Sequence, residues 1–133
     1  MAFPLNKILL VEDDPDIQLI TRLSLKAGGD YEVRACGSGA EAVQSARAWT
    51  PELILLDFMM PGMDGIATMD ALRELPWMAA VPVVFFTAYT QRQIQQELLA
   101  RGALGVIVKP IEPQALVEQI RALWQRYTSA STS

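Results

Sequence analysis

The chain has 133 residues, 51% of them hydrophobic, which suits one globular domain with a substantial apolar core. It contains no histidine and one cysteine, so histidine-based catalysis, zinc sites and an internal disulfide are excluded. A net charge of −4 argues against unaided binding to nucleic acid. The sequence shows no signal peptide and no apolar run near the ~20 residues that a membrane span requires, so we expect a cytoplasmic protein.

Five segments have the composition of β-strands. Residues 31–35 alternate apolar and polar side chains, which predicts a half-exposed edge strand. The other four are short apolar runs, too short for helices, and they predict strands buried on both faces. These runs are residues 8–11, 53–56, 83–86 and 106–108.

Helical patterns with recognisable caps fill the intervals between the strands. Asp14 before Pro15 predicts the start of a first helix, which Gly28 or Gly29 ends. Strands that alternate with helices predict a parallel sheet covered on both faces. The later helices have these predicted boundaries: Ser38 with Glu41 as a capping box, Asp64 as a cap, Thr90 as a cap with Gly102 at the end, and Pro113 as a start.

Polar residues follow the buried strands. Glu12 and Asp13 come directly after the first run, Asp57 after the second, Thr87 after the third and Lys109 after the fourth. In an open parallel sheet the carboxyl ends of the strands border the binding crevice. We therefore expect these five side chains to converge, although they are scattered along the chain.

Their chemistry is consistent with phosphoryl transfer. Three close carboxylates repel one another, and a hard divalent cation bound by oxygen atoms, Mg²⁺ or Mn²⁺ as a substitute, relieves that repulsion. A carboxylate that attacks phosphorus forms an acyl phosphate. Lys109 supplies positive charge for the phosphoryl oxygens, and the Thr87 hydroxyl supplies a hydrogen-bond donor.

These residues resemble the response-regulator receiver family of two-component signalling. The matching segments are residues 9–15 (LLVEDDP) and 57–65 (DFMMPGMDG), the Thr87-Ala88 pair, and Lys109-Pro110. The match runs in order from about Lys7 to about Tyr127, nearly the whole chain. The resemblance implies a flavodoxin-like, doubly wound sheet of five parallel strands in the order 2-1-3-4-5, with five helices.

The resemblance also implies roles for single residues. Asp57 would be the phosphoacceptor, with Thr87 and Lys109 as the phosphate-sensing pair and a cis peptide between Lys109 and Pro110. Mg²⁺ would be held by the carboxylates together with the backbone carbonyl of Met59. Asp14 is better explained as a helix cap than as a ligand. The implied metal-binding residues are Glu12, Asp13, Asp57 and Met59.

The family resemblance implies a signalling switch that catalyses only its own phosphorylation and dephosphorylation. A sensor histidine kinase or a phosphotransfer protein would supply the phosphoryl group, and segment 87–102 would then change conformation to control an unidentified partner. We expect residues 1–128 to form the receiver domain and residues 129–133 a disordered tail or linker. The chain would be either a single-domain regulator or the receiver of a longer one.

One position departs from the family pattern. An aromatic residue commonly stands three positions before the lysine, and here that residue is Val106, whose short, stiff side chain cannot swing. Tyr89 is the nearest aromatic substitute.

Three other functions compete with this interpretation. An aspartyl phosphohydrolase needs an acid where Met59 stands, because that residue protonates the leaving group. A flavodoxin needs a phosphate-binding first loop, which the acidic residues 12–14 contradict. A receiver that only binds partners would not need every chemical residue that is present here.

Overall fold

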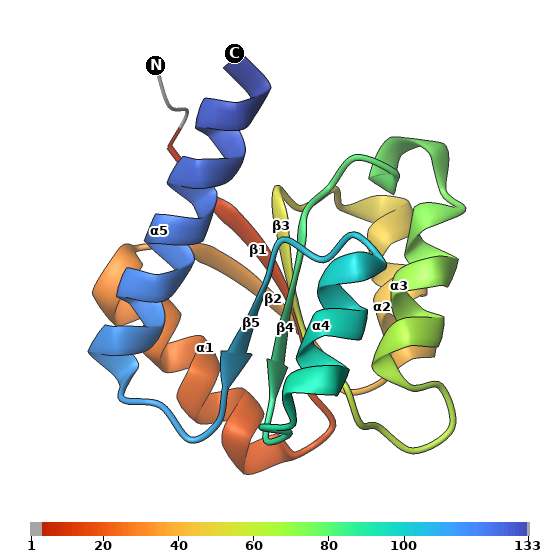
Figure 1. Cartoon of the computed structure of the whole chain (residues 1–133), viewed down its shortest axis with the longest axis horizontal. Helices are drawn as coiled ribbons and strands as arrows, with labels where there is room; N and C mark the ends of the chain where they lie inside the picture. Colours follow the sequence, from red (N-terminus) through yellow and green to blue (C-terminus); the bar gives the residue numbers. More distant parts are fainter. Residues whose placement is uncertain (1–3, 133) are drawn as a thin grey trace.

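The computed structural model describes residues 4–132, and Figure 1 shows a central sheet between two layers of helices. All strand pairs are parallel and the strand order is β2-β1-β3-β4-β5, which confirms the predicted fold. The strands are β1 (Lys7–Val11), β2 (Glu32–Cys36), β3 (Leu53–Leu56), β4 (Val83–Thr87) and β5 (Gly105–Val108).

Helices cover both faces of this sheet. Helices α1 and α5 lie on one face and α2, α3 and α4 on the other, so each face has its own apolar core. A short 3-10 helix, η1 (Pro76–Met78), precedes β4. The α-helices are α1 (Pro15–Gly29), α2 (Gly39–Ala48), α3 (Gly65–Arg73), α4 (Arg92–Ala100) and α5 (Pro113–Thr132). Among residues 4–132, none of these helices has the length and apolar character needed to cross a bilayer.

Burial along the strands follows the sequence patterns. The side chains of β3 and β4 are all buried, whereas β2 alternates between more and less exposed positions, as an edge strand does. The edge strand begins one residue later than predicted. Tyr31 lies just outside it, packed in the core between α1 and α5.

Three of the predicted helix caps are confirmed. Asp14 accepts hydrogen bonds from the backbone N–H groups of Asp16 and Ile17. The Ser38 hydroxyl accepts from the N–H of Glu41, and Asp64 caps α3 in the same way. These bonds satisfy N–H groups that have no partner within the helix.

The predicted cap of α4 is wrong. Gln91, not Thr90, occupies the cap position, and its side chain makes no capping hydrogen bond. The preceding loop is held by Tyr89, whose N–H donates to the Thr87 hydroxyl and whose carbonyl accepts from Gln95. We infer that these bonds keep the chain extended past Thr90, so the helix begins at Arg92.

Residues 129–132 of the predicted tail, 129–133, are helical, because α5 continues to Thr132, and residue 133 lies outside the described residues. Thr128 is buried, and its hydroxyl donates to the carbonyl of Trp124 within the helix. A threonine that bonds back to its own helix does not end it. A Ser/Thr-rich composition alone was therefore a poor indicator of where the last helix ends.

Candidate phosphoacceptor and metal site

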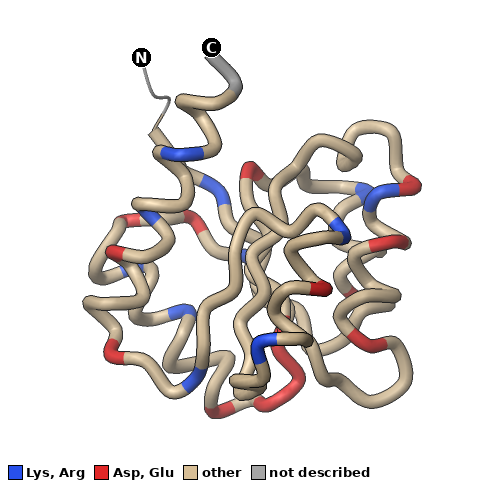
Figure 2. The backbone as a smooth tube through the Cα atoms, viewed as in Figure 1, with Lys and Arg blue, Asp and Glu red and all other residues tan. Residues whose placement is uncertain are grey.

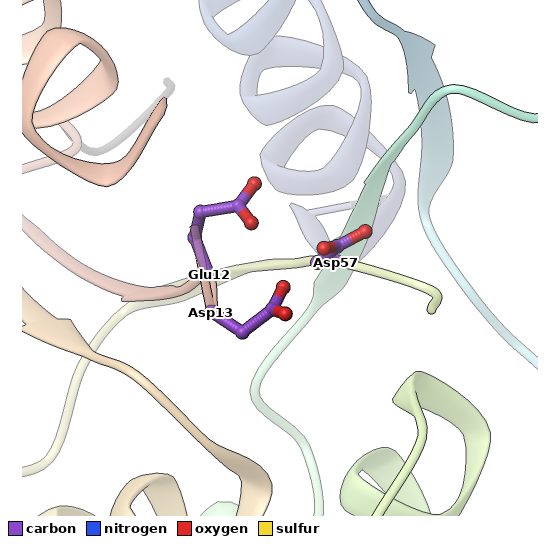
Figure 3. Close-up of side chains that lie close together, drawn as sticks. All are labelled: Glu12, Asp13 and Asp57. Carbon is purple, nitrogen blue, oxygen red and sulfur yellow. The ribbon is translucent and has the colours of Figure 1, made fainter. Parts of the chain in front are cut away.

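Three carboxylates meet at the carboxyl ends of β1 and β3. Val11 is paired with Leu56, and the N–H of Asp57 donates to the Val11 carbonyl, so the residues that follow the two strands are neighbours. Oxygen atoms of Glu12, Asp13 and Asp57 all lie within 4.8 Å of one another. Figure 3 shows the three carboxyl groups turned toward a common space.

Glu12 is the most firmly held of the three. The residue is 1% exposed, and its backbone N–H donates to the Cys36 carbonyl. One carboxylate oxygen accepts from the N–H of Asp14, and the backbone carbonyl accepts from the side-chain amide of Gln18. The start of α1 therefore fixes the position of Glu12.

Lys109 brings a positive charge to the carboxylates from the end of β5. Its ammonium group forms an ion pair with Glu12, and its Nζ lies 3.6 Å from Oδ2 of Asp57. The Lys109 side chain also passes over the Phe86 ring, with Nζ 5.1 Å from the ring centre. The Lys109-Pro110 peptide bond is cis, as expected.

The electrostatics of the site favour a bound cation. The pKa of Asp57 is raised to about 7, chiefly because the carboxyl group is buried. The Lys109 charge opposes this shift, whereas the Glu12 charge and hydrogen bonds with Glu12 and Asp13 add to it. The fold therefore disfavours the ionised form of Asp57, which lies beside two other acids and one lysine. A donor set made of carboxylate oxygens fits Mg²⁺ or Mn²⁺, and such an ion would stabilise the ionised form.

The other predicted site residues lie at this same end of the sheet. Thr87 is buried at the end of β4, and its carbonyl accepts from the N–H of Lys109. Met59 is 51% exposed in the loop after β3. Asp14 is occupied as a cap, and Val106 is half-buried against the core beneath α4. Figure 2 shows the continuous acidic stretch where β1 passes into α1.

The loop after Asp57 requires a glycine where it turns back. The N–H of Gly65 donates to the Phe58 carbonyl, and a Cβ on Gly65 would stand 2.5 Å from the carbonyl oxygen of Asp57. Any larger residue would push the end of β3 and the start of α3 apart. The ion pair between Lys109 and Glu12 was not predicted from the sequence, because no local pattern signals it.

The chain belongs to the response regulator receiver domain family, whose model matches residues 8–121. It is 36% identical over 121 residues to the DNA-binding response regulator MtrA of Mycolicibacterium smegmatis, a match that covers 91% of this chain and 51% of MtrA. It is 33% identical to the phosphate regulon transcriptional regulatory protein PhoB of Rhizobium meliloti, over 92% of this chain and 53% of PhoB.

Among solved structures, the chain is similar to the chemotaxis protein CheY4 of Vibrio cholerae. The TM-score is 0.83 at 30% identity, and the match covers 90% of this chain and 98% of CheY4. A CheY-like receiver domain from Methanospirillum hungatei has a TM-score of 0.81 at 27% identity, over 95% of this chain and 98% of that one. The chain thus spans about half the length of the curated relatives it matches, but nearly all of these receiver structures.

Proposed function

We propose that this receiver domain accepts a phosphoryl group on Asp57. The observation that supports it best is the position of Asp57: it lies beside Glu12 and Asp13 and 3.6 Å from the Lys109 ammonium group. An aspartate placed only for structure has no need of two acids and a lysine at the same strand ends. The aspartyl phosphohydrolase alternative lacks its acid, because Met59 occupies that place.

The proposed reaction is a transfer between a phosphohistidine and a carboxylate. An oxygen of Asp57 attacks phosphorus, the new P–O bond forms as the P–N bond of the donor breaks, and the electron pair leaves with the imidazole, which takes a proton. Lys109, 3.6 Å from Oδ2 of Asp57, would balance the charge on the phosphoryl oxygens, and the Thr87 hydroxyl would donate to one of them. The donor would be a sensor histidine kinase or a phosphotransfer protein.

Mg²⁺ is the proposed cofactor. Asp13 and Asp57 would bind it directly, Glu12 directly or through water, and the Met59 carbonyl would complete the protein ligands. When bound, the ion supplies positive charge that neutralises the phosphoryl oxygens during transfer. Glu12 would have to exchange its ion pair with Lys109 for the metal, which would free the ammonium group for the phosphoryl group.

The proposed output is a change in segment 87–102 that controls a partner. We propose that this domain acts as a switch rather than as an enzyme on other substrates, and that it does not itself bind nucleic acid, given its charge of −4. Relatives such as MtrA are named DNA-binding, but the chain spans only about half their length. The cytoplasmic location stays a prediction.

The test is incubation with a small phosphodonor, with and without Mg²⁺, followed by intact mass and borohydride trapping. We expect one phosphoryl group, dependent on Mg²⁺, on the peptide that contains Asp57. Asp57→Asn should not be labelled, while the matched variant Asp64→Asn, which changes a helix cap, should be labelled normally. Label on any other residue of the wild type would refute the assignment.

A further inference from the structure

Helix α4 is firmly attached at its C-terminal end. The Arg73 guanidinium, from the end of α3, donates to the carbonyls of Arg101 and Gly102 at 2.7 and 3.1 Å. Leu98, in the last turns of α4, is fully buried. These contacts fix the end of the helix that lies away from Asp57.

The N-terminal end of α4 is held more loosely. The side chain of its cap residue, Gln91, makes no capping hydrogen bond. The first turn is linked to the preceding loop by a long hydrogen bond of 3.4 Å from Nε2 of Gln95 to the Tyr89 carbonyl. Ile94 packs against the core only in part. The position of the first turn of α4 therefore depends on the position of Tyr89.

Tyr89 in turn contacts two residues at the site, Thr87 at the end of β4 and Phe58 in the loop after β3. Its N–H donates to the Thr87 hydroxyl at 3.1 Å. Its ring meets the ring of Phe58, the residue after Asp57, edge to face, with centres 5.5 Å apart and planes at 87°. Phe58 rests in the same way on the fully buried ring of Phe85. Such aromatic pairs have a preferred geometry, so a shift of one ring moves the other.

We propose that Tyr89 is the positioning residue that transmits the state of Asp57 to the first turn of α4, while Arg73 holds the other end of the helix. This inference rests on the proposed function. When the Thr87 hydroxyl turns to a phosphoryl oxygen, the Tyr89 amide bonded to it must follow, and the ring slides on Phe58. Gln95 then moves with the Tyr89 carbonyl. Val106 is too short to perform this role from β5.

The experiment uses beryllofluoride with Mg²⁺ as the phosphoryl probe and NMR amide shifts as the readout. In the wild type, shifts should change at residues 57–65 and at residues 92–96. Tyr89→Leu removes the ring contact, and we expect it to lower the α4 changes by about half or more, with probe affinity kept within about threefold. Tyr89→Phe, which keeps the ring, should behave as the wild type. Phe58→Leu, a second variant that breaks the same contact from the other side, should repeat the effect of Tyr89→Leu.

The outcomes separate this inference from the proposed function. Wild-type shifts around Asp57 together with undiminished α4 shifts in both Tyr89→Leu and Phe58→Leu would overturn the role of Tyr89 and leave the proposed function intact. Absence of any probe-dependent shift around Asp57 in the wild type would refute both. Arg73→Met should instead extend the shift changes to the C-terminal end of α4, and confinement of the changes to the first turn in that variant would overturn the role of Arg73.

Discussion

Lys109 forms its ion pair with Glu12, whereas its Nζ lies 3.6 Å from the nearest oxygen of Asp57. The Lys109 ammonium group, which would bind the phosphoryl group, is thus paired with Glu12, which would bind Mg²⁺. Metal and phosphoryl group together would therefore rearrange this pair, since Glu12 would turn to the metal as Lys109 turns to the phosphate.

Lys109→Met should leave Mg²⁺ binding intact but remove the conformational response. The variant loses the charge that would contact the phosphoryl group and keeps all three carboxylates. We expect beryllofluoride shifts near Asp57 to weaken and those in α4 to disappear, as measured by NMR. Lys26→Met, in the last turn of α1, is the matched control and should respond as the wild type. A full α4 response in Lys109→Met would argue against Lys109 as the sensor.

Asp13 and Asp14 are adjacent acids with separate predicted roles. Asp13→Asn should weaken Mg²⁺ binding about tenfold or more, because it removes a charged ligand. Asp14→Ala should cost about 1 kcal/mol of unfolding free energy through the lost cap of α1, with Mg²⁺ affinity unchanged. Mg²⁺ titration followed by NMR and urea unfolding measure the two effects. Equal loss of Mg²⁺ affinity in both variants would contradict the assignment.

The stability of the metal-free protein should depend on the ionisation of Asp57. Its pKa is raised to about 7 in the folded state, chiefly by burial, against 3.8 as the ordinary value. As pH rises from about 4 to about 7, the unfolded state loses this proton first, so the group makes the fold progressively less stable. At pH 8 without Mg²⁺, Asp57→Asn should be more stable than wild type by on the order of 2 kcal/mol, with little difference at pH 4.

Thermal unfolding at the two pH values measures this effect. Mg²⁺ should raise the Tm of the wild type at pH 8 and change that of Asp57→Asn much less, because the ion relieves the carboxylate repulsion. A stability difference that is the same at pH 4 and pH 8 would show that burial of this carboxyl group does not control the effect.

Met59 should slow the loss of the phosphoryl group. Hydrolysis needs a water aligned for attack opposite Asp57, and the exposed thioether of Met59 offers it no useful hydrogen bond. Met59→Asn should speed dephosphorylation by about tenfold, which requires only ~1.4 kcal/mol of barrier lowering. Phosphate loss after removal of the donor, in excess Mg²⁺, is the measurement. Met59→Leu is the control and should match the wild type, and unchanged loss in Met59→Asn would show that this position does not limit attack.

The sequence by itself determined the order of strands and helices and the residues that end the strands. Apolar runs too short for helices, separated by caps such as Asp14 and Ser38, could only alternate as strands and helices. Because parallel strands present their carboxyl ends at one edge, Glu12, Asp13 and Asp57 were expected to meet there. The strands and helices follow from local sequence patterns, and the meeting of the three carboxylates follows from the parallel arrangement of the strands.

Only the tertiary structure decided how those residues are paired. The contact of Lys109 with Glu12 and the contact of the Tyr89 ring with Phe58 join residues far apart in the chain, and each depends on side-chain directions set by packing. The start of α4 at Arg92 and the continuation of α5 through Thr128 are different, because the hydrogen bonds at these points are local to the chain. The amino-acid composition of these segments did not indicate those bonds. Local patterns specify which elements form, but the energies that select one partner among several arise when those elements are packed together.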